Sequence, residues 1–383
     1  MAKIRDIIAF HGPAAGLPSD LEEGEIAFTT DTHKFYVGDG TTNPVLIGPL
    51  PSLRGFVNRT DSVIAWDAGN TKVTLAVKSP ATSYSFYEDG ILYTKTTTQE
   101  CTLDNMNAGV HYVYFSGGTL VDSTDWPGFT VPLVAFVYTD GTNCIGLADE
   151  RHQYIMDSAT HGYLHSTVGT RYASGLTAAR LASGTGGADN DCKISITSGH
   201  VWDEDIDCDI VADDTATAPF QQILGLLGTY TPAQLPIYRR DGASGIWLKA
   251  TATTYVAYPS DGVGGATIPI GYNRYNAGSW GVAAVTDTYY TASWVVASNN
   301  QDCPVFIIMG QRQDPTLAAA QTNNTWESLS WPTANFKEFK ALYRLILRGG
   351  AAYANAINAY IAAVQDLRSV SNLPSGTYVA TAH

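Results

Sequence analysis

The chain has 383 residues, of which 45% are hydrophobic and 15% charged, with a formal net charge of −14. This length accommodates two or three domains with sizeable cores. The acidic balance argues against nucleic-acid binding, because phosphate contacts need a basic face and none is visible. The 22 Tyr, 8 Trp and 36 Gly residues are typical of an all-β protein with many turns.

Five cysteines are scattered along the chain at positions 101, 144, 192, 208 and 303, without C-x-x-C or zinc-like spacing. We therefore expect free thiols and no disulfide framework. The N-terminus lacks the apolar core of a signal peptide, and no apolar run reaches the roughly 18 residues of a membrane-spanning helix. We expect a protein made in a cytoplasm, without membrane insertion.

The sequence of residues 17–42 predicts a β-hairpin, because two β-prone runs are separated and followed by residues that favour turns. Glu25–Thr30 and Lys34–Val37 are short β-prone runs, joined by a polar turn and followed by Gly38-Asp39-Gly40, which can adopt positive φ. A lone hairpin of this size is marginally stable in water. Its apolar positions, Ile26, Phe28, Phe35, Tyr36 and Val37, need a partner surface, and we infer that other copies of the chain provide it.

The same residues carry a resemblance to a known family. The pattern Leu-x-x-Gly-Glu-Ile-Ala-Phe, a polar turn, then Lys-Phe-Tyr-Val-Gly-Asp-Gly-Thr resembles the N-terminal module of bacteriophage tail-fibre and baseplate proteins, over residues 17–48. In that family the module forms interleaved trimers near the start of the fibre. The resemblance implies a homotrimer in which the trimerisation and attachment motif is Leu21, Gly24, Glu25, Ile26, Phe28, Phe35, Tyr36, Gly38, Asp39 and Gly40.

After a Pro-rich connector at 44–51, short β-prone runs separated by turn signals follow at sandwich-like spacing up to residue 150. The expected strands are Ser62–Trp66, Lys72–Val77, Ser83–Tyr87, Ile91–Thr96, Val110–Phe115, Val131–Tyr138 and Cys144–Leu147. The segment Asp149–Gly175 favours short helical turns, and we interpret it as an interdomain neck. Its runs Asp-Glu-Arg-His, Thr-His-Gly-Tyr-Leu-His and Gly-Thr-Arg-Tyr-Ala-Ser-Gly are similar to segments of phage tail proteins.

Residues 191–310 return to strand patterns, and a second sandwich-like domain is the natural interpretation. The expected strands are Cys192–Thr197, Ile206–Val211, Pro236–Arg239, Ile246–Thr251, Thr254–Tyr258, Trp280–Val285, Tyr289–Ala297 and Val305–Met309. Beyond them, apolar residues at helical spacing predict two helices, the second of them Ala-rich. The first contains Phe336, Phe339, Leu342, Leu345 and Ile346, and the second contains Tyr353, Ile357, Tyr360, Ile361, Val364 and Leu367.

His161 and His165 lie at i, i+4 and would share one face of a helix, but the Glu that a zinc protease needs is absent. Six imidazoles at a threefold axis would suit an octahedral metal. A hydrogen-bonded neck without metal is the expectation. The acidic run Asp203–Asp209 alternates Asp with apolar residues, which favours a half-exposed strand over a calcium loop.

No motif singles out a catalytic residue or a cofactor: glycoside-cleaving carboxylates, a phosphate cradle and a nucleophile elbow all lack support. Loop aromatics are better candidates for ligand contact, because sugar rings stack on such faces. Trp126, Trp280, Tyr272 and Tyr275 lie in or beside turn-rich stretches.

The sequence therefore predicts a mainly β homotrimer with an interleaved N-terminal hairpin, two β-sandwich-like domains and short C-terminal helices. The expected units are a trimerisation and virion-attachment module (1–50), a first sandwich (51–150), a neck (151–190), a second sandwich (191–335) and a helical segment (336–383).

The expected function is that of a non-enzymatic tailed-phage structural protein on the tail or particle surface, a fibre or tail-tip component. Its expected partners are itself, other virion proteins and a host surface glycan or protein. The alternatives are a head fibre or capsid decoration protein, and a polysaccharide depolymerase.

Overall fold

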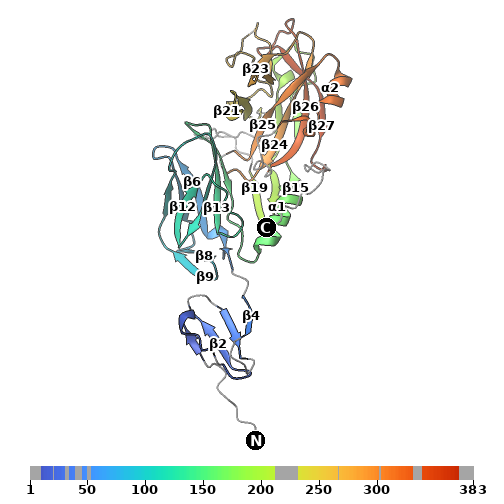
Figure 1. The fold of residues 1–383 in the computed structure, drawn as a ribbon. Helices are drawn as coiled ribbons and strands as arrows, with labels where there is room; N and C mark the ends of the chain where they lie inside the picture. The colour runs from blue at the N-terminus through green and yellow to red at the C-terminus, as the bar shows by residue number, and fades with distance from the viewer. Residues whose placement is uncertain are drawn as a thin grey trace.

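The structure is a computed structural model that describes residues 10–19, 21–30, 34–38, 45–49, 53–211, 232–265, 267–301, 303–330 and 339–370. The fold is mainly β, with two α-helices in these ranges. A small N-terminal sheet stands apart from a larger body in which two β regions lie side by side (Figure 1). The 3₁₀ turns are η1 (Ala14–Gly16), η2 (Arg59–Asp61), η3 (Asp189–Cys192) and η4 (Trp326–Ser328).

The N-terminal module is a four-stranded sheet in the order β1-β2-β3-β4. Its strands are β1 (Phe10–Gly12), β2 (Ile26–Thr29), β3 (Lys34–Val37) and β4 (Val45–Pro49). β2 and β3 form the predicted antiparallel hairpin with Phe28 opposite Phe35. β1 adds a parallel strand on the other side of β2, which the sequence did not predict.

The first β region encloses its own core between three sheets, ordered β5-β8-β9, β10-β7-β6 and β12-β11-β13-β14. Large buried side chains such as Phe56, Phe86 and Phe115 fill that core. The strands are β5 (Gly55–Phe56), β6 (Ser62–Asp67), β7 (Lys72–Val77), β8 (Tyr84–Glu88), β9 (Ile91–Lys95), β10 (Gln99–Thr102), β11 (Gly109–Ser116), β12 (Thr119–Ser123), β13 (Leu133–Thr139) and β14 (Cys144–Asp149).

Helix α1 (Ser158–Thr167) and short strands follow the first β region. Asp157 caps the helix, since its side chain accepts hydrogen bonds from the amides of Ala159 and Thr160. The strands are β15 (Arg171–Gly175), β16 (Ala178–Arg180), β17 (Ile194–Ile196), β18 (Gly199–Asp203) and β19 (Ile206–Ile210). In β19, Ile206 and Ile210 are buried whereas Asp207 and Asp209 are exposed, which confirms a half-exposed strand.

The C-terminal β region is built on a six-stranded sheet in the order β21-β20-β25-β24-β26-β27. All neighbouring pairs are antiparallel except β20 with β25. The elements are β20 (Leu235–Asp241), β21 (Ile246–Thr253), β22 (Gly271–Asn276), β23 (Ser279–Ala284), β24 (Tyr290–Ser298), β25 (Val305–Asp314), α2 (Leu317–Asn323), β26 (Phe339–Gly349) and β27 (Ala359–Asp366).

Both faces of the six-stranded sheet are buried at its centre. Along β24, Val295 and Ala297 point into one core, whereas Trp294 and Val296 point into another, as the two-residue period of a strand requires. The second core also contains Tyr112 and other side chains of the first β region. The two β regions are therefore packed directly against each other and share a core.

The prediction of two C-terminal helices from apolar spacing is wrong for the residues that the structure describes. Residues 339–349 form β26 and residues 359–366 form β27, each paired into the six-stranded sheet. In β26 every residue but Arg348 is buried, so the apolar positions carry no diagnostic period. Phe336 lies outside the described residues. Thr254–Tyr258, predicted as a strand, lies beyond the end of β21 and forms no strand.

All five cysteines are free, as predicted, and four of them are buried. Within the described ranges, neither α-helix is long and apolar enough to cross a membrane.

The shared core makes a stability prediction. Trp294→Ala should lower the free energy of unfolding by about 3–5 kcal/mol, because the fully buried indole leaves a cavity that β24 cannot close. Trp202→Ala is the matched control: this indole is 36% exposed, so its removal should cost distinctly less. Urea unfolding of both variants measures the difference, and equal losses would contradict the packing described for Trp294.

Candidate functional site

The glycines of the N-terminal motif close the hairpin. Gly24 has a φ of +81°, and its amide donates to the carbonyl of Gly38 at 2.8 Å. The amide of Gly38 donates in turn to the carbonyl of Glu25 at 2.8 Å. A Cβ on Gly38 would lie 2.1 Å from the carbonyl oxygen of Glu22, so only glycine fits there. The Glu25 carboxylate accepts the Glu22 amide at 2.9 Å.

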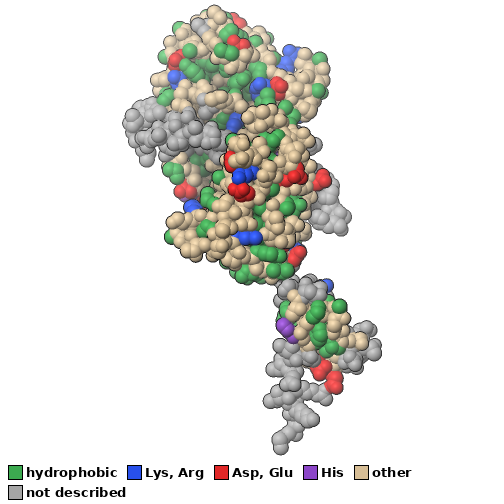
Figure 2. All heavy atoms as spheres, turned by 90° about the vertical axis from the view of Figure 1, so that its left-hand side faces the viewer, with side chains coloured by type: hydrophobic (Ala, Val, Ile, Leu, Met, Phe, Trp, Pro, Cys, Tyr) green, Lys and Arg blue, Asp and Glu red, His purple; other side chains and the backbone are tan. Residues whose placement is uncertain are grey.

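The apolar side chains of the motif divide into a small buried set and a larger half-covered set. Leu21 is buried, whereas Ile26, Phe28 and Tyr36 are only partly covered and Phe35 is 36% exposed. Hydrophobic side chains gather on the surface of this module in the space-filling view (Figure 2). Asp39 and Gly40 lie outside the described residues. The module therefore presents an apolar surface that its described residues do not cover.

A second cluster lies in the body and combines imidazoles with carboxylates. Glu150 and His152 follow β14, His161 and His165 lie on α1, and Glu204 sits in the β18–β19 turn. His161 and His165 share a helical face, as predicted, with ring centroids 6.3 Å apart. We call these five residues the histidine–carboxylate cluster.

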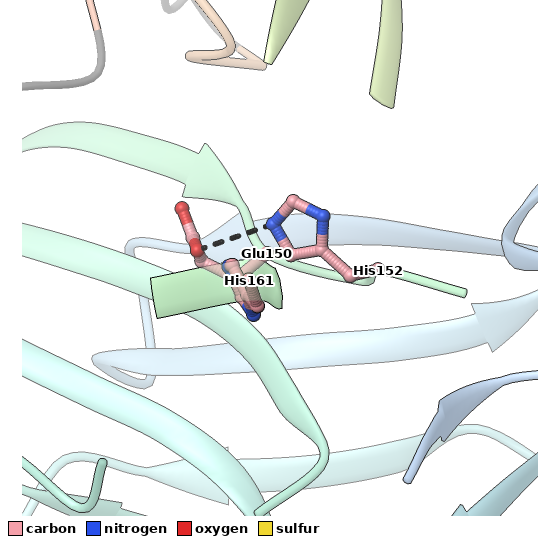
Figure 3. Close-up of side chains that lie close together, drawn as sticks. All are labelled: Glu150, His152 and His161. Atoms are coloured by element: carbon pink, nitrogen blue, oxygen red, sulfur yellow. Dashed lines mark ion pairs between the residues drawn. The ribbon is translucent and has the colours of Figure 1, made fainter. Parts of the chain in front are cut away.

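Most of the cluster is buried within one chain. Glu150, His152 and His161 are 1%, 5% and 6% exposed, and His152 and His161 face each other with ring centroids 4.1 Å apart. Nε2 of His152 lies 3.7 Å from Oε2 of Glu150, the pair marked in Figure 3, and 3.6 Å from Oε2 of Glu204. Nδ1 of His165 lies 3.7 Å from Oε1 of Glu204.

Two further carboxylates lie beside the cluster, and one of them, Asp205, bonds to a cluster residue. Asp205 accepts a hydrogen bond from Nδ1 of His152 at 2.5 Å and another from the amide of Gln153 at 2.9 Å. Asp203 accepts from Thr170 at 3.1 Å and from the side-chain amide of Asn299 at 2.5 Å. The Asp205 contact fixes the ring of His152 so that Nε2 faces Glu150 and Glu204.

Burial and charge perturb these groups strongly. Burial alone would lower the pKa of His152, but its hydrogen bond to Asp205 and the negative charges of Glu204 and Asp205 raise it to about 9. Burial raises the pKa of Asp203 to about 6. Burial, with the charges of His152 and His165 nearby, lowers the pKa of His161 far below its usual range. The His161 imidazole is therefore neutral near pH 7, with a lone pair to share.

Next to the cluster lies a buried ion-pair network. Nε and Nη2 of Arg151 donate to the Asp149 carboxylate at 2.7 and 2.6 Å. Nη1 of Arg151 donates to the carbonyl of Ser62 at 2.7 Å, and Arg59 approaches Asp149 at 3.2 Å. Because Asp149 is fully buried, its charge depends on these two guanidinium groups.

The loop aromatics differ in accessibility. Trp126 is 42% exposed but packs edge-on against Phe136, and Tyr272 is buried at 8%. Tyr275 is 57% exposed, with its ring 5.3 Å from that of Trp280. Of the four loop aromatics singled out in the sequence, Tyr275 on the β22–β23 hairpin is the most exposed, so its ring can stack on a flat or cyclic ligand.

The sequence offered His161 and His165 as candidate metal ligands in a neck that was expected to hold no metal, and it did not indicate that Glu150, His152 and Glu204 lie beside them. The run Asp149-Glu-Arg-His152 stood out only through its resemblance to phage tail segments, and Glu204 was hidden inside an acidic run. Nothing in the sequence spacing indicated that these three residues meet, because the β18–β19 turn is some fifty residues away from His152 along the chain.

No protein-family model matches the chain, and a search of curated proteins found no match. Among solved structures, it overlaps with the Major Tropism Determinant P3c variant at 13% identity over 93% of each chain, with a TM-score of 0.25. The M1 variant gives 15% identity over 53% of this chain and 54% of that chain, with a TM-score of 0.21. The I1 variant gives 17% identity, with a TM-score of 0.20, over 36% of this chain and 43% of that chain. The chain thus spans about half the length of the M1 and I1 variants, and a likeness this loose carries no argument about its fold or function.

The ion-pair network makes a second stability prediction. Arg151→Met should lower the free energy of unfolding by about 3–5 kcal/mol, because it removes the main ion-pair partner of the buried Asp149 carboxylate. Arg54→Met is the control: Arg54 pairs with Asp89, whose side chain is 65% exposed, so the loss should stay below about 1 kcal/mol. Chemical unfolding measures both, and a small loss for Arg151→Met would mean that Asp149 is solvated or protonated.

Proposed function

We propose that the chain is a structural protein of a tailed-phage virion, a homotrimeric fibre or tail-tip component that attaches to the host surface. The observation that carries the proposal is the N-terminal module. Residues 26–29 and 34–37 of the motif form the antiparallel hairpin expected from the sequence, and its large apolar side chains remain half-covered in the described residues.

The half-covered apolar surface of the module supports the proposed trimer. Phe28 and Phe35 lie opposite each other on β2 and β3, with ring centroids 4.9 Å apart. A four-stranded sheet whose described residues bury so little apolar surface gains stability when other copies cover it. Three interleaved modules would bury these rings and direct three bodies away from one attachment point.

The body would then present surfaces to the host. The exposed Tyr275 and the partly buried Trp280 lie on a hairpin of the C-terminal region, and Arg240 stacks over Trp280 at 4.4 Å, which holds that ring in place. We expect this pair to contact a host glycan or protein by stacking, with no bond broken. The acidic net charge discourages loose association between assembled trimers and disfavours nucleic acid as a partner.

The isolated full-length chain should have the mass of a trimer by multi-angle light scattering. Phe35→Ser should shift it towards the monomer, because it replaces an interface ring with a hydroxyl. Ile155→Ser, which alters a 71% exposed side chain of the body, should leave the mass unchanged. A monomeric unmodified chain would overturn the proposed trimer.

Removing residues 1–50 should abolish incorporation into particles, because it removes the proposed attachment module, while circular dichroism still reports a folded β body. Immunogold labelling of intact particles distinguishes a tail from a head location. Retained incorporation of the shortened chain would move the attachment site into the body. Release of reducing ends from host polysaccharide by the purified chain would favour a depolymerase instead.

A further inference from the structure

The histidine–carboxylate cluster contains two buried imidazole nitrogens without a hydrogen-bond partner among the described residues, Nε2 of His152 and Nε2 of His161. Both side chains are more than nine-tenths buried. A buried polar atom without a hydrogen-bond partner lowers the stability of the fold by about 1–3 kcal/mol. Two such atoms in contacting rings, beside carboxylates, call for a cation that both nitrogens can coordinate, with Nε2 of His152 releasing its proton as the cation binds.

The distances within the cluster suit a shared ion better than direct hydrogen bonds. Nε2 of His152 is 3.6 Å from Glu204 and 3.7 Å from Glu150, which is too long for a hydrogen bond. Two ligand atoms on one tetrahedral ion, each about 2.0–2.1 Å from it, lie about 3.4 Å apart. Glu150, His152 and His161 each offer one ligand atom within 4.8 Å of the others, and so do His161, His165 and Glu204.

The surroundings of His152 are those of a metal ligand. Its Nδ1 bonds to the Asp205 carboxylate at 2.5 Å, the arrangement that orients zinc-bound imidazoles and makes them more basic. The site also has a surplus of negative charge, since Glu150, Asp203, Glu204 and Asp205 gather there. A divalent cation would offset that charge, which few buried sites could otherwise sustain.

We propose that the cluster binds one divalent transition-metal ion, with Zn²⁺ the best fit, through His152, His161, Glu150 and Glu204. The mixture of imidazole and carboxylate, without thiolate or backbone oxygens, favours Zn²⁺ over Ca²⁺ or Mg²⁺. His165 lies against the other oxygen of Glu204 at 3.7 Å and orients that carboxylate. All ligands come from one chain, so the site needs no symmetry axis.

The ion has a structural role. Its ligands come from the end of β14, from α1 and from the β18–β19 turn, which are three separate parts of the body. Glu204 adopts a φ of +46°, an uncommon conformation for this residue type, in the turn that brings its buried side chain to the cluster. With four protein ligands and buried surroundings, the site is closed, as structural zinc sites are. The metal would lock the first β region to the α1 and β18–β19 segments.

The test uses the untagged full-length chain, loaded with Zn²⁺ and then desalted, with metal measured by mass spectrometry. We expect about one zinc ion per chain, and chelator treatment should lower the melting temperature. Cobalt substitution should give the visible absorption of a tetrahedral site. His161→Ala and Glu204→Gln should each lose most of the bound metal. Asp205→Asn, which changes only the orienting carboxylate, should weaken zinc affinity about 10–100-fold.

His200→Ala is the matched control, because this histidine lies on β18 with its side chain 41% exposed, near Asp207 and Asp209 rather than in the cluster. It should retain full metal content. Circular dichroism separates metal loss from failure to fold, and the Asp205→Asn titration remains available if the ligand variants do not fold. A folded, unmodified chain that retains no zinc would overturn the proposal, as would folded ligand variants that bind zinc like the unmodified chain.

Discussion

The body of this protein depends on the burial of one sheet from both sides. β24 lies at the centre of the six-stranded sheet, between β25 and β26, and its side chains alternate between two apolar cores. One core belongs to the C-terminal region and the segment before it, whereas the other is shared with the first β region. Burial of apolar surface stabilises a contact by roughly 25 cal/mol per Å². We therefore infer that the shared core supplies most of the free energy that joins the two regions.

The polar junction is a consequence of that packing. Once the β11–β14 sheet lies against the six-stranded sheet, the end of β14 comes close to the loop after β24. There Asn299 donates to the carbonyl of Asp149 at 3.0 Å, and its amide also reaches Asp203. The histidine–carboxylate cluster forms where these segments converge. Its geometry is therefore set by apolar contacts made elsewhere, which hold the charged groups closer together than they would lie in water.

Much of the local structure could be predicted from the sequence, and the long-range arrangement could not. Lys72–Val77 was predicted to the residue because alternating apolar positions and Gly-containing turns mark a half-buried strand. β26 was missed for the opposite reason: Leu342, Leu345 and Ile346 fit a helical spacing, and because nearly every residue of this strand is buried, including Lys340 and Arg344, its sequence lacks the two-residue alternation of a half-buried strand.

In the candidate site, too, the local structure could be predicted from the sequence but the long-range contacts could not. The helix that places His161 and His165 on one face follows from short-range signals, including the Asp157 cap. The meeting of these residues with Glu150 and Glu204 depends on tertiary packing, which no local pattern encodes. For the N-terminal hairpin the local signals were sufficient, because its two strands are adjacent in the sequence and Gly24 and Gly38 allow close backbone contact at its open end.

The apolar and polar parts of the junction have different physical roles. Apolar contact between two sheets is strong but weakly directional, so it tolerates small shifts of one sheet over the other. The Asp149–Arg151 network and the histidine–carboxylate cluster are directional, because each buried charge is costly unless its partner lies within hydrogen-bonding or ligand distance. We infer that the shared core supplies most of the attraction and that the polar groups select one register, which would hold exposed elements such as the β22–β23 hairpin in a constant orientation to the rest of the body.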